Sequence, residues 1–324
     1  MPDDLRLGLV GCGRIAERGY LPALRRVRGM RLVGLADRVP SRCRQLVPDV
    51  PSYPDAATMI AAGGVDAIVL ATPASAHIAD ARRAGEAGLP TLVEKPPAVD
   101  AGEAATLVRI VRPPWIGFNR RFDPLIARLR EAVPANGDLA LFLDLHYESG
   151  SWRPYAVADD ALLAVGTHLI DLARWLTHSD VHRARAVAVE PNRAVLELEL
   201  TRGPARISCA TDRPLRDRIV VRNAAGWQIA RHEGVGLRSK VHLLTTMLRD
   251  PNLRRLIHPA SRTSLVRLLI RELEAFGSAA RGGDASVLAT AADGLAVMTV
   301  IDAVRRSASD GASWQALRVP VLSP

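Results

Sequence analysis

The chain has 324 residues, 48% of them hydrophobic and 24% charged, so its composition fits two globular domains and excludes a disordered chain or a single small disulfide-stapled module. The three cysteines, Cys12, Cys43 and Cys209, form no CxxC pair, which argues against a disulfide framework and a cysteine zinc site. The net charge of +9 is carried by dispersed arginines, with only Lys95 and Lys240 as lysines, and this argues against nucleic-acid binding.

We expect a soluble, cytoplasmic protein. The residues Met1-Pro2-Asp3-Asp4 are acidic where a signal peptide would be basic. No apolar run reaches the roughly 18 residues that a membrane span requires, so we expect no membrane interaction. The absence of paired cysteines fits a reducing compartment.

The first third of the chain alternates short apolar runs with helix-length segments, the pattern of βαβ units around a parallel sheet. The predicted strands cover residues 5–10, 31–36, 67–71, 91–93 and 115–118. The predicted helices cover residues 14–27, 41–46, 56–62, 76–87 and 101–111. We therefore expect an α/β domain with a parallel sheet over residues 1–118.

The remaining chain, residues 119–324, has strand-like runs that follow one another with short turns. They cover residues 139–148, 183–189, 193–201, 205–211, 216–222 and 226–232, and two helices are expected near 262–280 and 285–306. Consecutive strands predict a mostly antiparallel sheet in a second, α+β domain. In the third of these strands Leu196, Leu198 and Leu200 alternate with Glu197 and Glu199, so one face of that strand contacts solvent or a partner.

The sequence Gly11-Cys12-Gly13-Arg14-Ile15-Ala16 follows the first predicted strand and begins a helix. Gly11 permits a tight turn, Gly13 lets the backbone approach a pyrophosphate, and Ala16 lets the helix pack closely on the strand. The N–H groups of the first helical turn, which includes Arg14 and Ile15, then face the phosphates. This arrangement predicts a dinucleotide-binding Rossmann domain.

Asp37 stands at the end of the second predicted strand, where a carboxylate would accept hydrogen bonds from the adenosine ribose. Its charge would repel a 2′-phosphate, so we expect NAD(H) as the cofactor. Arg38 and Arg42 would accommodate the phosphate if Asp37 turned away, which leaves NADP(H) as an alternative.

Further motifs at strand ends and in the second domain carry a resemblance. They are Ala71-Thr72-Pro73-Ala74-Ser75-Ala76-His77, Glu94-Lys95-Pro96, Gly117-Phe118-Asn119-Arg120-Arg121-Phe122 and Gly166-Thr167-His168-Leu169-Ile170-Asp171. With the glycine-rich loop, the chain resembles the Gfo/Idh/MocA oxidoreductases over nearly its whole length. The resemblance implies a Rossmann domain, an open, mostly antiparallel sheet that forms homodimers or homotetramers, and nicotinamide-dependent redox chemistry on sugar or cyclitol hydroxyls.

Lys95 is the predicted catalytic amine. It follows a strand at the carboxyl edge of the parallel sheet, where its ammonium can polarise a carbonyl or stabilise an alkoxide. A lysine can also exchange a proton near neutral pH, which an arginine cannot. The alternative is a surface lysine paired with Glu94. Pro96 allows either a cis or a trans peptide bond.

His168 is the second predicted catalytic residue, a proton acceptor or donor that matches the family histidine. Asp171, one helical turn further, is expected to be structural. Inositol dehydrogenase-like members carry an aspartate four residues before this histidine, whereas this chain has Ala164. Lys95 and His168 suffice without it, or Asp159, Asp160 or Tyr155 replaces it, or the chain has a different substrate or a non-catalytic role.

The other candidate residues surround this site. The resemblance implies cofactor contacts for Thr72, Pro73, His77, Glu94 and Lys95, beside Gly11, Gly13, Arg14, Ile15, Asp37 and Arg38. Candidates for substrate contacts are Lys95, Asn119, Arg121, Trp152, Tyr155 and His168, although the two aromatic residues also fit a core position. No metal is expected.

These observations predict an NAD(H)-preferring oxidoreductase that moves a hydride between nicotinamide and a secondary alcohol or ketone of a sugar, cyclitol or sugar derivative. One alternative is a keto-sugar or imine reductase of a secondary-metabolite pathway. The other is a non-catalytic, NAD-binding regulatory protein, which Ala164 favours.

Overall fold

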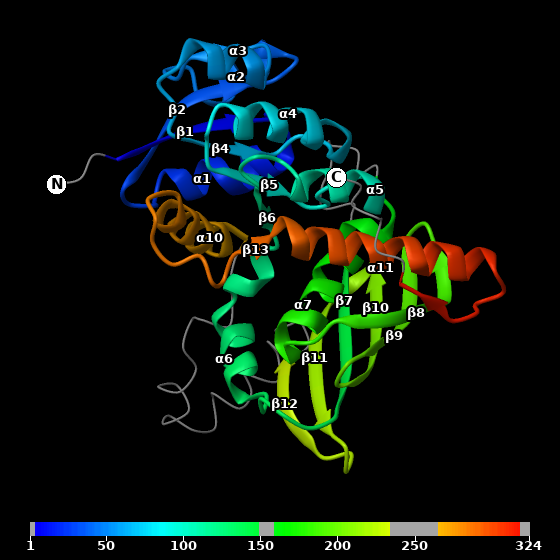
Figure 1. Cartoon of the computed structure of the whole chain (residues 1–324). Helices are drawn as coiled ribbons and strands as arrows, with labels where there is room; N and C mark the ends of the chain where they lie inside the picture. The colour runs from blue at the N-terminus through cyan, green and yellow to red at the C-terminus, as the bar shows by residue number, and fades with distance from the viewer. Residues whose placement is uncertain (1–3, 149–158, 234–264, 318–324) are drawn as a thin grey trace, which may run out of the picture. The chain divides into compact units, whose positions relative to one another are not determined.

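The computed structural model describes residues 4–148, 159–233 and 265–317 (Figure 1). They form two compact units. The N-terminal unit comprises the described residues up to Phe122 together with Leu265–Asp302. The C-terminal unit comprises the described residues from Asp123 to 233 together with Ala303–Leu317.

This division differs from the expected one, 1–118 and 119–324, because the chain returns to its first unit. The helix α10 (Leu265–Ala280) and the first part of α11 (Ala291–Ser309) belong to the N-terminal unit. The buried side chains Leu269, Leu273 and Phe276 of α10 share one hydrophobic core with the first strand. They lie at helical spacing, on a single face of α10.

The N-terminal unit contains a parallel sheet in the strand order β3-β2-β1-β4-β5-β6, with β13 added antiparallel to β6. The strands are β1 (Leu5–Val10), β2 (Met30–Ala36), β3 (Ser52–Tyr53), β4 (Ala67–Leu70), β5 (Thr91–Glu94), β6 (Trp115–Gly117) and β13 (Ala289–Thr290). All five predicted strands are confirmed. The order reverses between β1 and β4, which is the point where open α/β sheets bind ligands at their carboxyl edge.

The helices of this unit are η1 (Ala16–Tyr20), α1 (Leu21–Leu24), α2 (Pro40–Leu46), α3 (Ala56–Ala62), α4 (Ala74–Glu86), α5 (Ala101–Val108) and η2 (Asn119–Phe122). Two of them, α3 and α5, begin directly after an aspartate that caps them. The Asp55 and Asp100 side chains cap α3 and α5 by accepting backbone N–H bonds of 2.7 and 2.8 Å. The segment η1 is a π-helix, and Tyr20 at its end is fully buried.

The C-terminal unit contains a second sheet in the order β12-β11-β7-β10-β9-β8-β14, in which only the β7–β10 pair is parallel among the described strands. Its elements are α6 (Pro124–Ala132), β7 (Leu139–Glu148), η4 (Leu162–Gly166), α7 (Thr167–Thr177), β8 (Val181–Glu190), β9 (Arg193–Leu200), β10 (Gly203–Ala210), β11 (Asp212–Asn223), β12 (Gln228–Glu233) and β14 (Gln315–Ala316). The predicted, mostly antiparallel sheet is confirmed.

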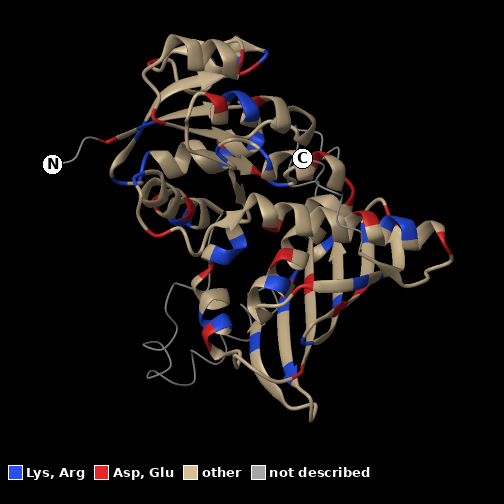
Figure 2. Ribbon diagram, in the orientation of Figure 1, with Lys and Arg blue, Asp and Glu red and all other residues tan. Residues whose placement is uncertain are grey.

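The two faces of the second sheet differ as the alternation in β9 predicts. Leu196, Leu198 and Leu200 are buried on the face that packs against η4. Glu197 lies on the opposite, outer face, where the guanidinium groups of Arg185 and Arg206 on the neighbouring strands hold its pKa below the usual range. Figure 2 shows basic and acidic residues interspersed on both units rather than gathered in one region.

In the described parts of the chain, none of the helices combines the length and the apolar character that crossing a bilayer would require.

The packing of α10 on the N-terminal sheet gives a stability prediction. Phe276 is fully buried and contacts the ring of Trp115 edge-to-face at 5.8 Å. We expect Phe276→Ala to lower the free energy of unfolding by about 3–5 kcal/mol, because the cavity cannot be refilled. Urea titration monitored by tryptophan fluorescence measures this change. Val111→Ala, at a position 87% exposed, is the control and should change the free energy by less than about 0.5 kcal/mol.

Candidate functional site

The glycine-rich turn after β1 has the geometry of a phosphate-binding loop. Gly11 has a φ of +96°, and a Cβ atom there would lie 2.5 Å from the carbonyl oxygen of Ala71 at the end of β4. Only glycine fits this close approach. A Cβ atom on Gly13, by contrast, would meet no heavy atom within 4 Å. The backbone at Gly13 therefore faces open space, as the approach of a pyrophosphate requires.

The helix that follows this turn begins at Arg14 and is held to it by a hydrogen bond from the Glu17 N–H to the Gly13 carbonyl, 3.0 Å. Arg14 and Ile15 are half-buried in its first turn. The first N–H groups of a helix have no intrahelical acceptor, so this turn suits an anionic group.

Asp37 lies where the sequence predicts, directly after β2. Its Oδ2 accepts the Cys12 N–H at 2.7 Å and its Oδ1 accepts the Val39 N–H at 2.8 Å. The carboxylate is thus fixed against the glycine turn, and each oxygen keeps acceptor capacity for a ribose hydroxyl. Arg38 is exposed beside it. These positions fit NAD.

The loop after β4 offers one further polar group. The Thr72 hydroxyl oxygen is buried and has no hydrogen-bond partner among the described residues, as expected of a group that a ligand would satisfy. Pro73 is exposed at the start of α4. Three features therefore fit a bound dinucleotide: the open space at the Gly13 backbone, the remaining acceptor capacity of the Asp37 carboxylate and the unsatisfied Thr72 hydroxyl.

His77 is buried and connects two loops of the N-terminal unit. Its Nε2 lies 2.8 Å from the Thr72 carbonyl oxygen, and its Nδ1 lies 3.3 Å from that of Pro97. Burial lowers the pKa of this imidazole, so it is neutral near pH 7. Its ring nitrogens face the protein's own carbonyls, which favours a structural role. A direct contact with the cofactor stays a prediction.

The end of β5 places Lys95 beside a buried carboxyl group. Glu94 is 4% exposed; its Oε2 accepts the Lys95 backbone N–H at 3.0 Å, and its Oε1 accepts the Tyr20 hydroxyl at 2.8 Å. Burial raises the pKa of Glu94, whereas the charge of Lys95 lowers it. Lys95 itself is half-buried, and the Lys95–Pro96 peptide bond is cis. A surface ion pair does not describe this arrangement, because Glu94 is part of the interior.

His168 and Asp171 lie in the C-terminal unit, both buried on α7 directly after the π-helical segment η4. Ala164 is buried within η4. Of the residues considered as replacements for an aspartate there, Asp160 caps the helix by accepting the Leu163 N–H at 2.8 Å and pairs with Arg305 at 3.3 Å. Its carboxylate thus already has structural partners.

The remaining predicted substrate contacts divide into two groups. Asn119 and Arg121 are buried in η2, and the Arg121 guanidinium lies 3.4 Å from the Asp293 carboxylate of α11. This ion pair gives Arg121 a partner within its own unit. Trp152 and Tyr155 lie outside the described residues. The roles of all four in substrate binding stay predictions.

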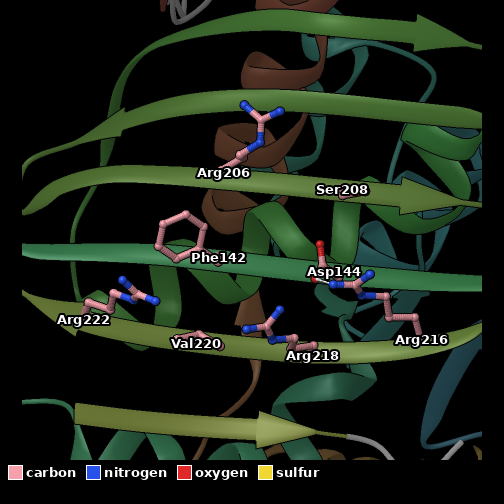
Figure 3. A pocket seen from close by; sticks show the side chains of 8 residues that line it. All are labelled: Phe142, Asp144, Arg206, Ser208, Arg216, Arg218, Val220 and Arg222. Atoms are coloured by element: carbon pink, nitrogen blue, oxygen red, sulfur yellow. Dashed lines mark ion pairs between the residues drawn. The ribbon is translucent and has the colours of Figure 1, made fainter. Parts of the chain in front are cut away.

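The outer face of the second sheet contains a hollow of about 390 Å³ that the sequence did not indicate (Figure 3). Arg216 pairs there with Asp144 at 2.9 Å, and the Arg222 guanidinium lies 5.7 Å from the centre of the Phe142 ring. The lining residues are Phe142, Asp144, Arg206, Ser208, Arg216, Arg218, Val220 and Arg222. Strand pairing gathers arginines that are dispersed in the sequence. No group of potential metal ligands occurs within the described ranges.

Sequence reasoning also missed two residues that adjoin Glu94. Tyr20 is fully buried at the end of η1, and Glu272 is fully buried on α10. A signal for Glu272 exists, since it lies between Leu269, Leu273 and Phe276 on the apolar face of its helix, where a carboxyl group is out of place. No local pattern indicates its partners.

The position of Asp37 generates a prediction about cofactor choice. We expect Asp37→Asn to reduce the preference for NADH over NADPH at least about tenfold, because a charge-assisted hydrogen bond and the repulsion of a 2′-phosphate are both lost. Fluorescence titration with each cofactor measures the two dissociation constants without any substrate. Asp49→Asn, an exposed position with the same change of charge, is the control. An unchanged preference would contradict the assignment of Asp37.

Comparison with known proteins agrees with this geometry. The model of the Gfo/Idh/MocA oxidoreductase family, described by an NAD-binding Rossmann fold, matches residues 5–113. The chain is 28% identical to the rhizopine catabolism protein MocA of Rhizobium meliloti, over 92% of this chain and 93% of that protein. It is also 28% identical to inositol 2-dehydrogenase 1 of Saccharopolyspora erythraea, over 95% of each chain.

Among solved structures, scyllo-inositol dehydrogenase from Lactobacillus casei with bound NAD(H) and scyllo-inositol has a TM-score of 0.77 at 15% identity, covering 97% of this chain and 99% of that one. That likeness concerns the fold alone. The family model matches residues 5–113 and the two sequence relatives align over more than nine-tenths of the chain, so the N-terminal unit contains the NAD-binding Rossmann domain of the Gfo/Idh/MocA oxidoreductase family.

Proposed function

We propose that the protein oxidises a secondary alcohol of a cyclitol of the inositol class, or of a sugar derivative, to the ketone with NAD, and catalyses the reverse reduction. The names of the relatives support the cyclitol class, since one is an inositol 2-dehydrogenase. The preference for NAD rests on Asp37, whose fixed carboxylate opposes a 2′-phosphate.

The observation that carries this proposal is the half-buried Lys95 at the carboxyl end of β5, directly after the buried Glu94. This edge of the sheet also carries the glycine turn after β1 and the Thr72 loop after β4. An ammonium group at such an edge attracts the oxygen of a bound alcohol and stabilises the negative charge that develops on it. The backbone N–H of Lys95 donates to the Glu94 carboxylate, which fixes the point from which the lysine side chain extends.

We assign the proton to His168. NAD, when bound, supplies the acceptor for the hydride of the carbinol carbon. In the oxidation direction His168 accepts the hydroxyl proton while Lys95 holds the oxygen. In the reduction direction Lys95 polarises the carbonyl and His168 returns the proton. Asp160 has other partners. We assign the reaction to Lys95 and His168 alone, without a replacement for the aspartate expected at Ala164.

The role of Lys95 is tested by substitution. We expect Lys95→Met to lower kcat for the active inositol about 10²- to 10⁴-fold, because the charge on the substrate oxygen loses its stabilising partner. The assay follows NADH absorbance with a panel of inositols, sugars and aminosugars, first with NAD and then with NADP. Lys240→Met, which changes the only other lysine, is the control. Turnover by Lys95→Met at the rate of the unsubstituted protein would refute the assignment.

We also propose that the outer face of the second sheet is the interface between copies of this chain. It presents Phe142, 40% exposed, and Trp314, 36% exposed, among charged residues of both signs. Such a mixed face is self-complementary, since the guanidinium groups on one copy can meet carboxylates on the other. The resemblance to the family implies the same use of the sheet.

This interface gives a prediction for the assembly state. We expect Phe142→Glu to convert a dimer or tetramer into smaller species, since a carboxylate would then be buried between subunits. Sedimentation velocity measures the distribution of species. Val111→Glu, at an exposed site of the other unit, should leave it unchanged. A monomeric unsubstituted protein would overturn the proposal.

A further inference from the structure

Glu272 is a buried acid that the proposed chemistry does not use. Its side chain is 0% exposed, and neither carboxyl oxygen has a hydrogen-bond partner among the described residues. An ionised carboxyl group in such a place is costly unless donors surround it. Glu272 therefore needs either a donor or a proton of its own.

Within the described ranges, two groups from other elements act on the Glu272 carboxyl. They are the Tyr20 hydroxyl from η1 and the Glu94 carboxyl from the end of β5, which is followed by Lys95. The single proton of Tyr20 is already directed to Glu94 Oε1, 2.8 Å away. Two carboxylates this close repel each other, and burial together with that repulsion raises the pKa of Glu272 well above its usual range.

The neighbouring charged residues do not supply the missing donor either. The Arg271 guanidinium on the same helix donates to the Phe122 carbonyl oxygen at 3.3 Å. The segment η2, which also packs against α10, carries Arg120 and Arg121, and Arg121 pairs with Asp293. Neither Arg120 nor Arg121 is among the groups that act on the Glu272 carboxyl.

One assignment of protons gives Glu272 a partner and keeps the hydrogen bond from Tyr20 to Glu94. A protonated Glu272 can donate to the Tyr20 oxygen, which has free lone pairs, while Tyr20 donates to Glu94. Glu94 then stays ionised and accepts the Lys95 N–H at its other oxygen. The result is a chain of hydrogen bonds in one direction, with a single negative charge next to the ammonium of Lys95.

We propose that Glu272 is a positioning residue that carries a proton in the active enzyme and, through Tyr20 and the Glu94 carboxylate, holds Lys95 in place. This inference rests on the proposed function, in which Lys95 is the catalytic amine. It predicts that loss of the Glu272 proton at high pH places two charges together, breaks the chain at Tyr20 and disturbs Lys95.

The protonation state can be measured without turnover. The infrared difference spectrum between the unsubstituted protein and Glu272→Gln at neutral pH should contain the carbonyl-stretch band of a protonated carboxylic acid. Glu274→Gln, an exposed position on the same helix, should remove only carboxylate bands. Absence of the acid band in the first spectrum would overturn the inference whatever the enzyme's activity.

Stability gives a second readout that does not need a substrate. Because the folded state holds this proton above the pKa of an unfolded glutamate, about 4.3, it binds more protons than the unfolded state and loses stability as the pH rises. Glu272→Gln cannot ionise, so its Tm should increase relative to that of the unsubstituted protein between about pH 5 and 8. A constant difference in Tm would contradict the inference.

Kinetics test the positioning role. We expect Glu272→Ala to lower kcat about tenfold with little change in the KM for NAD, and Glu272→Gln to restore most of that loss, because its amide can still donate to Tyr20. The alkaline limb of the kcat profile should move to higher pH in Glu272→Gln. If kcat fell equally in Glu272→Ala and Glu272→Gln and the alkaline limb of the kcat profile did not move, the positioning role of Glu272 would be refuted. An unsubstituted protein without turnover would instead count against the proposed function, while the infrared band would still decide the state of Glu272.

Discussion

The burial of the Glu94 carboxyl is the constraint on which the candidate site depends. A carboxyl group in the interior must find hydrogen bonds or a counter-charge, and Glu94 finds both, in Tyr20 and in Lys95 with its backbone N–H. These contacts join the helix after the glycine turn to the end of β5. The amine, the phosphate-binding turn and α10, which closes the core behind Tyr20, therefore form one structural unit.

Much of this arrangement was predictable because it is encoded locally. The spacing of apolar residues along the chain predicts the strands and helices. The strand order of a Rossmann sheet then brings the segments after β1, β4 and β5 to one edge. Gly11 and Asp37 lie directly after β1 and β2, as the pattern predicts, because a position relative to a strand end is specified by local sequence. The alternation of Leu196, Leu198 and Leu200 with glutamates likewise indicated a sheet with one buried face.

What could not be predicted depends on contacts between distant segments. The return of α10 to the N-terminal unit brings Glu272 to Tyr20, more than 250 positions earlier in the chain. The arginines of the outer hollow become neighbours only through strand pairing. The partners that His77 and Arg121 have within the protein, the carbonyl oxygens of Thr72 and Pro97 and the Asp293 carboxylate, likewise come from other segments, and their contacts with ligands stay predictions. A polar residue near a strand end has the same sequence pattern whether its side chain contacts a ligand or hydrogen-bonds to the protein's own backbone.

The central claim is that this chain transfers a hydride from a carbinol carbon to NAD. The most direct test incubates the protein with NAD and an inositol that carries deuterium on its ring carbons, and determines the mass of the nicotinamide product. We predict NADH that contains one deuterium at C4. Unlabelled NADH, or no reduced cofactor with any inositol or sugar substrate, would contradict the account.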